Sequence, residues 1–80
     1  MYYVYIVECA DKSLYTGITT NVERRFKEHQ TGTGAKFTRA KRAVKIVHVE
    51  RKLNRSTASR REAEIKKLKR QEKLALIKNA

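Results

Sequence analysis

The chain begins with two runs of β-branched and aromatic residues, separated by a short polar segment. Residues 2–9 read YYVYIVEC, residues 14–19 read LYTGIT, and the ADKS between them is rich in turn-forming residues. This pattern predicts a β-hairpin. Because side chains alternate between the faces of a strand, Tyr3, Tyr5 and Val7 share one face and Val4 and Ile6 share the other. Both faces are apolar, so we expect both to be covered.

Gly17 lies near the end of the second predicted strand, where it has no side chain to pack. A glycine at such a position marks either a simple bulge or a close approach of the backbone to a ligand or another element. Its position alone does not choose between these two interpretations.

A helix is predicted over the next stretch, TNVERRFKEHQTGTG. Thr20 followed three residues later by Glu23 forms a capping-box pattern, and Asn21 is a competing N-cap. Gly32 and Gly34 are expected to end the helix.

The face of this helix that meets the sheet combines apolar and polar groups. Phe26 is flanked by Arg25 and His29, which lie four residues apart on the same side, whereas Arg24 and Lys27 can point to water. A lone histidine on an apolar face is more often a core residue. Its pairing with an arginine, beneath two strand tyrosines, favours a functional role.

A basic loop and a third strand follow. In the loop GAKFTRAKRA, three side chains could reach phosphates, namely Lys36, Thr38 and Arg39. The apolar run VKIVHVE predicts the strand, and His48 within it is most simply a structural or edge residue.

The last third of the chain is helical in pattern. Ser56 is expected to start a helix whose apolar ladder is Ala58, Ile65 and Leu68. Glu62 falls inside that ladder and Glu64 on the far side. A carboxylate in an apolar stripe needs a cation. Glu62 is therefore either the partner of a lysine or arginine, or a metal ligand or general base.

A second helical stretch, QEKLALIKNA, closes the sequence, with a bend expected at Lys69 to Gln71 and with Leu74 and Ile77 facing inward. The order is strand, strand, helix, strand, helix, helix. It predicts an α+β fold in which helices pack on a three-stranded antiparallel sheet. Eighty residues suit a single domain, residues 1–80.

Charge narrows the choice of partners. Lys and Arg number 20 against 8 Asp and Glu, which gives a net charge of +12. This density favours nucleic acid, with a membrane surface or an acidic protein as alternatives. The lone Cys9 excludes an intramolecular disulfide, and no segment resembles a membrane span or a signal peptide. We therefore expect a cytoplasmic protein.

This ordered set of residues resembles the GIY-YIG endonuclease superfamily, in particular its small standalone members, over nearly the whole chain. The first signature corresponds to Tyr3-Val4-Tyr5 and the second to Tyr15-Thr16-Gly17. The stretch GTGAKFT at 32–38 is also typical of the short members. The sequence departs from the pattern at Tyr3, where glycine is usual, at Thr16, where isoleucine is usual, and in having only Asn79 as a downstream asparagine.

The resemblance implies a divalent-metal-dependent endonuclease that hydrolyses phosphodiester bonds. The matching catalytic positions are Tyr5, Tyr15, Arg25, His29 and Glu62. Glu62 would hold one Mg²⁺ or Mn²⁺ ion, and Arg25 would stabilise charge that builds in the transition state. Tyr5 would act as the base or position the water, and Arg25, His29 and the metal would favour its phenolate. Tyr15 would position the phosphate.

The same resemblance suggests the substrate. Gly17 would leave room for the substrate backbone. Larger family members carry separate DNA-reading domains, which this chain lacks, so we expect DNA binding without sequence specificity. Single-stranded or structured DNA is favoured, RNA is possible, and no membrane partner is expected. The main rival is a non-catalytic, basic RNA- or ribosome-associated module. A subunit of a larger nuclease is a third interpretation.

Overall fold

The computed structural model describes residues 1–32 and 41–79, and it confirms the predicted fold class and element order. The strands are β1 (Tyr2–Cys9), β2 (Leu14–Thr19) and β3 (Ala43–Lys52). The helices are α1 (Val22–Thr31), α3 (Arg55–Lys66) and α4 (Arg70–Asn79). The protein is α+β, with helices on an antiparallel sheet.

The sheet has the order β2-β1-β3, so β1 is central and β2 and β3 are the edges. Both neighbours run antiparallel to β1. In this register Tyr5 lies opposite Gly17 on one side and Val49 on the other. The tyrosine of the first signature and the glycine of the second are therefore adjacent because of strand pairing alone.

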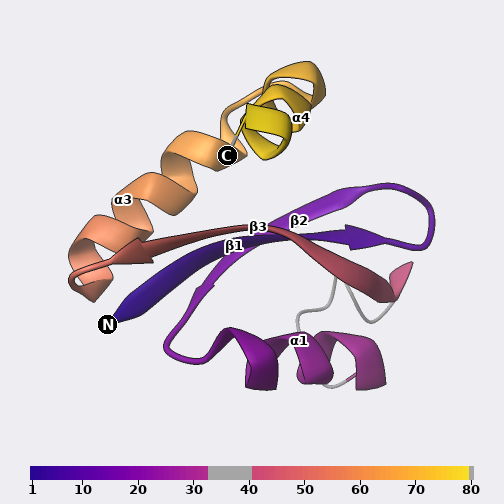
Figure 1. Cartoon of the computed structure of the whole chain (residues 1–80), viewed down its shortest axis with the longest axis horizontal. Helices are drawn as coiled ribbons and strands as arrows, with labels where there is room; N and C mark the ends of the chain where they lie inside the picture. The colour runs from indigo at the N-terminus through magenta and orange to yellow at the C-terminus, as the bar shows by residue number, and fades with distance from the viewer. Residues whose placement is uncertain (33–40, 80) are drawn as a thin grey trace.

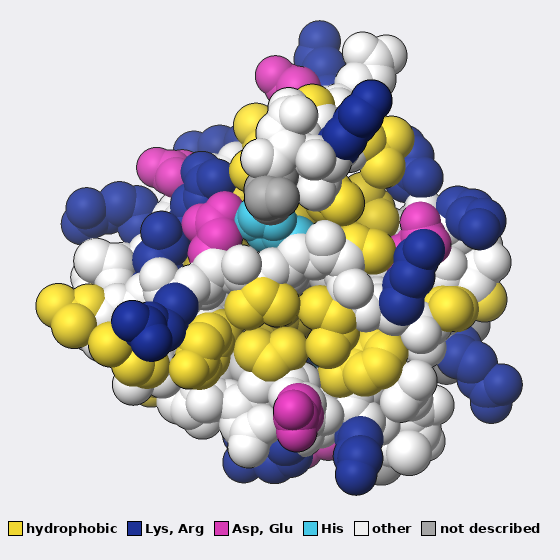
Figure 2. Space-filling model, in the orientation of Figure 1, with side chains coloured by type: hydrophobic (Ala, Val, Ile, Leu, Met, Phe, Trp, Pro, Cys, Tyr) yellow, Lys and Arg dark blue, Asp and Glu magenta, His cyan; other side chains and the backbone are white. Residues whose placement is uncertain are grey.

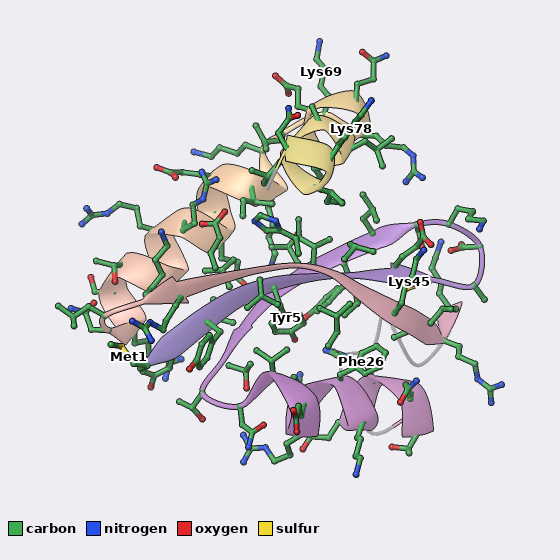
Figure 3. All side chains as sticks on the ribbon, in the orientation of Figure 1. Met1, Tyr5, Phe26, Lys45, Lys69 and Lys78 are labelled. Carbon is green, nitrogen blue, oxygen red and sulfur yellow. The ribbon has the colours of Figure 1, made fainter. Side chains whose placement is uncertain are left out.

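Helices cover both faces of the sheet, as the apolar character of both faces of β1 predicted. Figure 1 shows α1 against one face and α3 with α4 against the other. The cluster beneath α3 contains Val4, Ile6, Ala58 and Ile65. The cluster on the α1 side contains Tyr5, Val7 and Ala43, with Val22 and Phe26 packed against it. Tyr5 and Phe26 can be seen in the layer between the sheet and α1 (Figure 3).

The first helix starts at the second of its two predicted caps, and the start of α3 differs from the prediction. The N-cap of α1 is Asn21, whose side chain accepts from the backbone N–H of Arg24, and Thr20 is not the cap. The N-cap of α3 is Asn54 rather than Ser56, and it forms a capping box with Thr57. Asparagine ranks above threonine at this position, which explains the first result. Gly32 ends α1 as predicted, with φ of 84° in the left-handed region.

The C-terminal helices also differ in detail. The break comes at the C-cap Lys67, before the predicted bend, and α4 begins at Arg70. Leu74 is 42% exposed, and Leu76 packs with Ile77 against the α3-side cluster instead. The prediction for Leu74 was wrong because the start of α4 sets which side chains turn inward. No described helix is long and apolar enough to cross a membrane.

His48 takes the structural role that was its simplest interpretation. It is buried on β3, and its Nε2 lies 2.8 Å from Oε2 of Glu50. The same carboxylate accepts two hydrogen bonds from Arg61 of α3, from Nε at 2.8 Å and from Nη2 at 3.1 Å. These contacts hold the pKa of Glu50 at about 2, with the Arg61 bonds as the main cause. They tie β3 to α3.

Candidate active site

A cluster of three rings stands at the centre of the site. The hydroxyl of Tyr5 lies 2.7 Å from Nε2 of His29, and both side chains are almost fully buried. The ring centroids of Tyr5 and Tyr15 are 6.4 Å apart, and those of Tyr15 and His29 are 5.2 Å apart in an edge-on arrangement. Strand β1, strand β2 and helix α1 each contribute one ring, so three predicted site residues are brought together.

Gly17 makes this cluster possible. A Cβ added at this position would lie 2.6 Å from the hydroxyl oxygen of Tyr5 and 3.2 Å from Cε2 of Tyr15. The phenol of Tyr5 therefore crosses the edge strand through space that only glycine leaves open. Gly17 was expected to leave that room for a substrate backbone, whereas here the protein's own side chain fills it. Contact of Gly17 with nucleic acid stays a prediction.

The electrostatics of the rings differ from the expectation. Burial, and then the charge of Arg25, lower the pKa of His29, so its imidazole is neutral at pH 7. Burial raises the pKa of Tyr5 to about 12, although the nearby guanidinium of Arg25 opposes this shift. The expectation that His29 would be a cation favouring a phenolate was wrong for the protein alone, because His29 is too deeply buried. Tyr5 is a neutral phenol.

Arg25 connects the rings to the surface. Its Nη1 donates to Oε1 of Glu28 at 2.8 Å, and its charge lies close enough to Tyr5 to act on the pKa of that phenol. The Arg25 side chain keeps 31% of its surface exposed, so an anion can still reach it. Glu28 was not among the predicted site residues. Its spacing of three residues from Arg25 on a helix was the signal for this pair.

Glu62 approaches from the opposite layer. It lies on α3, its side chain is 23% exposed, and its Oε2 is 3.4 Å from Nζ of Lys66. It is near enough to Tyr5 for its charge to raise the pKa of that phenol. Glu64 is well exposed, as the helix phase predicted, and pairs with Arg61. The site therefore wraps around the β2 edge, with Tyr5 from the α1 side and Glu62 from the α3 side.

The described residues limit how a metal could be held. Within residues 1–32 and 41–79, no three His, Cys, Asp or Glu side chains gather in a way that could hold a metal ion. Glu62 would act as a single carboxylate ligand, and Mg²⁺ commonly keeps several waters in such sites. A half-buried carboxylate with an exposed edge suits that arrangement, and Lys66 would have to release it.

The predicted phosphate-binding loop cannot be placed. Lys36, Thr38 and Arg39 lie outside the described residues, so their role stays a prediction. A pocket of about 310 Å³ does open beside Arg25, between α1 and the start of α3. Arg24 lines it together with Arg25, although Arg24 was expected only to face water.

Known proteins share this sequence and arrangement. The model of the GIY-YIG catalytic domain matches residues 1–75. The chain belongs to the GIY-YIG family. Members of the GIY-YIG superfamily are nucleases, and the match suggests nuclease activity.

Similar GIY-YIG proteins include a UPF0213 protein of Syntrophus aciditrophicus, which is 56% identical over 95% of this chain and 88% of its own. The UPF0213 protein NP_0776A of Natronomonas pharaonis is 54% identical over 95% of this chain and 89% of its own. The solution structure of the UPF0213 protein BH0048 from Bacillus halodurans is 44% identical, with a TM-score of 0.62 over 98% of this chain and 84% of that one. These similarities extend over nearly the whole GIY-YIG chain.

Proposed function

We propose that this GIY-YIG protein is a divalent-metal-dependent endonuclease that hydrolyses DNA without sequence specificity and favours single-stranded or structured DNA. The observation that carries the proposal is the Tyr5 hydroxyl, which lies 2.7 Å from Nε2 of the neutral His29 imidazole and within electrostatic range of the Arg25 guanidinium. Glu62 lies within electrostatic range of the same phenol. Together they provide a proton path, a cation and a carboxylate at one sheet edge.

The neutral state of both rings suggests how a water would be activated. A phenol with a pKa of about 12 is hardly ionised at pH 7, so Tyr5 cannot act as a phenolate base. It can still accept one proton while it donates another. In the tautomer where Nε2 of His29 is unprotonated, Tyr5 donates its proton to that nitrogen and takes one from the attacking water. His29 then carries a positive charge only while negative charge builds on the phosphate, since burial and Arg25 favour the neutral imidazole at rest.

Arg25 would stabilise that charge. A guanidinium has five N–H donors, so the bond to Glu28 leaves others for the non-bridging oxygens of the phosphate. Tyr15 would orient the phosphate from the edge strand. Glu62 would hold one Mg²⁺ or Mn²⁺ ion, which supplies Lewis acidity and stabilises the leaving oxygen when it is bound.

The preference for nucleic acid rests on charge. Lys and Arg side chains surround the face of the molecule in Figure 2, in keeping with the net charge of +12. Lys69 and Lys78 point away from the sheet at α4 (Figure 3). Such a distribution binds phosphates without reading bases, so RNA is a second substrate class. A cytoplasmic location is part of the same proposal.

A cleavage assay tests the proposal. Labelled single-stranded, duplex and branched DNA are incubated with the protein and Mg²⁺ or Mn²⁺, beside Glu62→Gln and the matched control Glu64→Gln. We expect the Glu62 variant to be inactive, to bind DNA, and to melt at or above the parent temperature, since its pair with the exposed Lys66 contributes little. The Glu64 variant should stay active. Tight binding with no metal-dependent cleavage by the parent would favour the non-catalytic basic module.

A further inference from the structure

We propose that the pocket between α1 and α3 is a second phosphate subsite, which holds the backbone phosphate next to the cleaved linkage. The inference rests on the proposed function for the nature of the ligand. The subsite involves Arg24 and Arg55, two residues that the proposed catalytic site does not use. The pocket has a volume of about 310 Å³, near the lower end of the range of ligand sites.

Charge is the first reason to assign an anion to this pocket. Arg24, Arg25 and Arg55 line it from α1 and from the first turn of α3, and Glu28 supplies the one carboxylate among the described lining residues. Glu28 is engaged by Arg25 at 2.8 Å. Within the part of the chain that the structure describes, neither Arg24 nor Arg55 forms an ion pair. The bond from Arg25 lowers the pKa of the Glu28 carboxyl, and Arg24 is near enough for its charge to add to that shift. Even so, neither Arg24 nor Arg55 is held by an acid in the described residues.

Geometry is the second reason. The pocket lies along the edge strand β2, whose residues Ile18 and Thr19 line its wall, and the ring of Tyr2 contributes an apolar surface. Arg25 is shared with the catalytic cluster, because it lines the pocket and also lies within electrostatic range of Tyr5. A nucleic-acid strand running along β2 would present one phosphate to Arg25 and its neighbour to Arg24 and Arg55. Guanidinium forks suit the non-bridging oxygens of a phosphodiester.

The shared arginine defines what the subsite would do. Arg24 and Arg55 touch only the neighbouring phosphate, so they would bind ground state and transition state equally. Their loss should raise KM and leave kcat nearly unchanged. They would also fix the direction in which the nucleic-acid strand crosses Tyr5. Contacts to the phosphates alone would then place one phosphodiester linkage next to the catalytic group.

Binding is measured first, by anisotropy of a labelled single-stranded DNA decamer in EDTA, where no metal supports hydrolysis. The variants are Arg24→Ala and Arg55→Ala, with Lys27→Ala and Arg60→Ala as controls, which are exposed residues of the same two helices outside the pocket lining. Loss of a charged contact predicts roughly tenfold weaker binding for each pocket variant and a salt slope reduced by about 1. The controls should change binding far less.

Cleavage kinetics then test which phosphate Arg24 and Arg55 contact. With metal present, KM should rise about tenfold for the pocket variants, with kcat held. A neutral methylphosphonate at the linkage next to the cleaved one should remove the difference between parent and Arg55→Ala. Pocket variants that match the controls in binding, or that lower kcat at constant KM, overturn the subsite. If the parent cleaves nothing yet Arg24→Ala and Arg55→Ala still lose binding selectively, the subsite stands and the proposed nuclease fails.

Discussion

Gly17→Ala separates two explanations for one glycine. The new Cβ would lie 2.6 Å from the Tyr5 oxygen and 2.8 Å from its Cζ, so the oxygen must retreat by about 0.4 Å merely to reach 3.0 Å. Tyr5 is 1% exposed and hydrogen-bonded to His29, so it has little room to move. We expect the substitution to displace the phenol and to destabilise the fold.

The size of the effect follows from two opposing contributions. Overpacking a core typically costs about 1–3 kcal/mol. Gly17 does not have a positive φ, so alanine can adopt its backbone conformation. Alanine also lowers the conformational entropy of the unfolded chain, which stabilises the folded protein by roughly 0.4–1 kcal/mol. A net loss of about 1–2 kcal/mol would lower the melting temperature by about 5–15 °C in a domain of this size. The cleavage rate should fall by a larger factor than the loss of stability explains, because the displaced Tyr5 hydroxyl loses its hydrogen bond to His29.

Thermal unfolding followed by circular dichroism measures this change, and Tyr5→Phe serves as the second arm. Without the hydroxyl the closest contact disappears, so Gly17→Ala should cost less stability in the Tyr5→Phe background than in the parent. A Gly17→Ala protein that melts at or above the parent temperature but binds DNA poorly would refute the reasoning. That result would mean that the glycine admits substrate, as its position first suggested.

Three other quantities can be measured on the same protein. If roughly 4–6 phosphates are contacted, the logarithm of DNA affinity should fall against the logarithm of salt with a slope of about −3 to −5, and a slope near zero would remove the electrostatic argument. Arg25→Ala should reduce kcat by on the order of a hundredfold while weakening binding far less, with Lys27→Ala as the control; equal loss of binding in both variants would make Arg25 ordinary surface charge. Glu50→Gln should cost about 3 kcal/mol at pH 7, since the folded pKa of about 2 lies below the ordinary 4.5. That stability is present above about pH 4.5 and is lost as pH falls toward 2, so urea unfolding at pH 7 and pH 3 should show the gap shrinking, and a constant gap would contradict it.

The regular elements were predictable because their signals are local. Period two in β1 and the glycine at the end of α1 depend on a few neighbouring residues, and both predictions were confirmed. The second helix cap was not predictable in the same way. Ser56 and Asn54 are both good caps, and the choice depends on where β3 ends and the chain turns.

The charge states within the site depend on tertiary packing and could not be predicted from sequence. The spacing of Arg25 and His29 indicated a shared face, but only burial beneath the sheet makes the imidazole neutral. Likewise, the sequence separates Arg24 from Arg55 by a whole strand and a loop. Their common pocket exists because α1 and α3, on opposite faces of the sheet, both contribute residues at the edge of β2.

The wrapping of the site around β2 has a consequence for incomplete chains. Tyr5, Tyr15, Arg25 and His29 are synthesised before β3, whereas Glu62 arrives only with α3 on the other side of the sheet. A fragment that stops after β3, through truncation or proteolysis, would keep the cationic and phenolic groups but lack the carboxylate. Such a fragment would also lose Ala58 and Ile65, which cover Val4 and Ile6 of β1. Helix α3 therefore completes both the core and the site, and we expect cleavage to begin only after α3 has been synthesised.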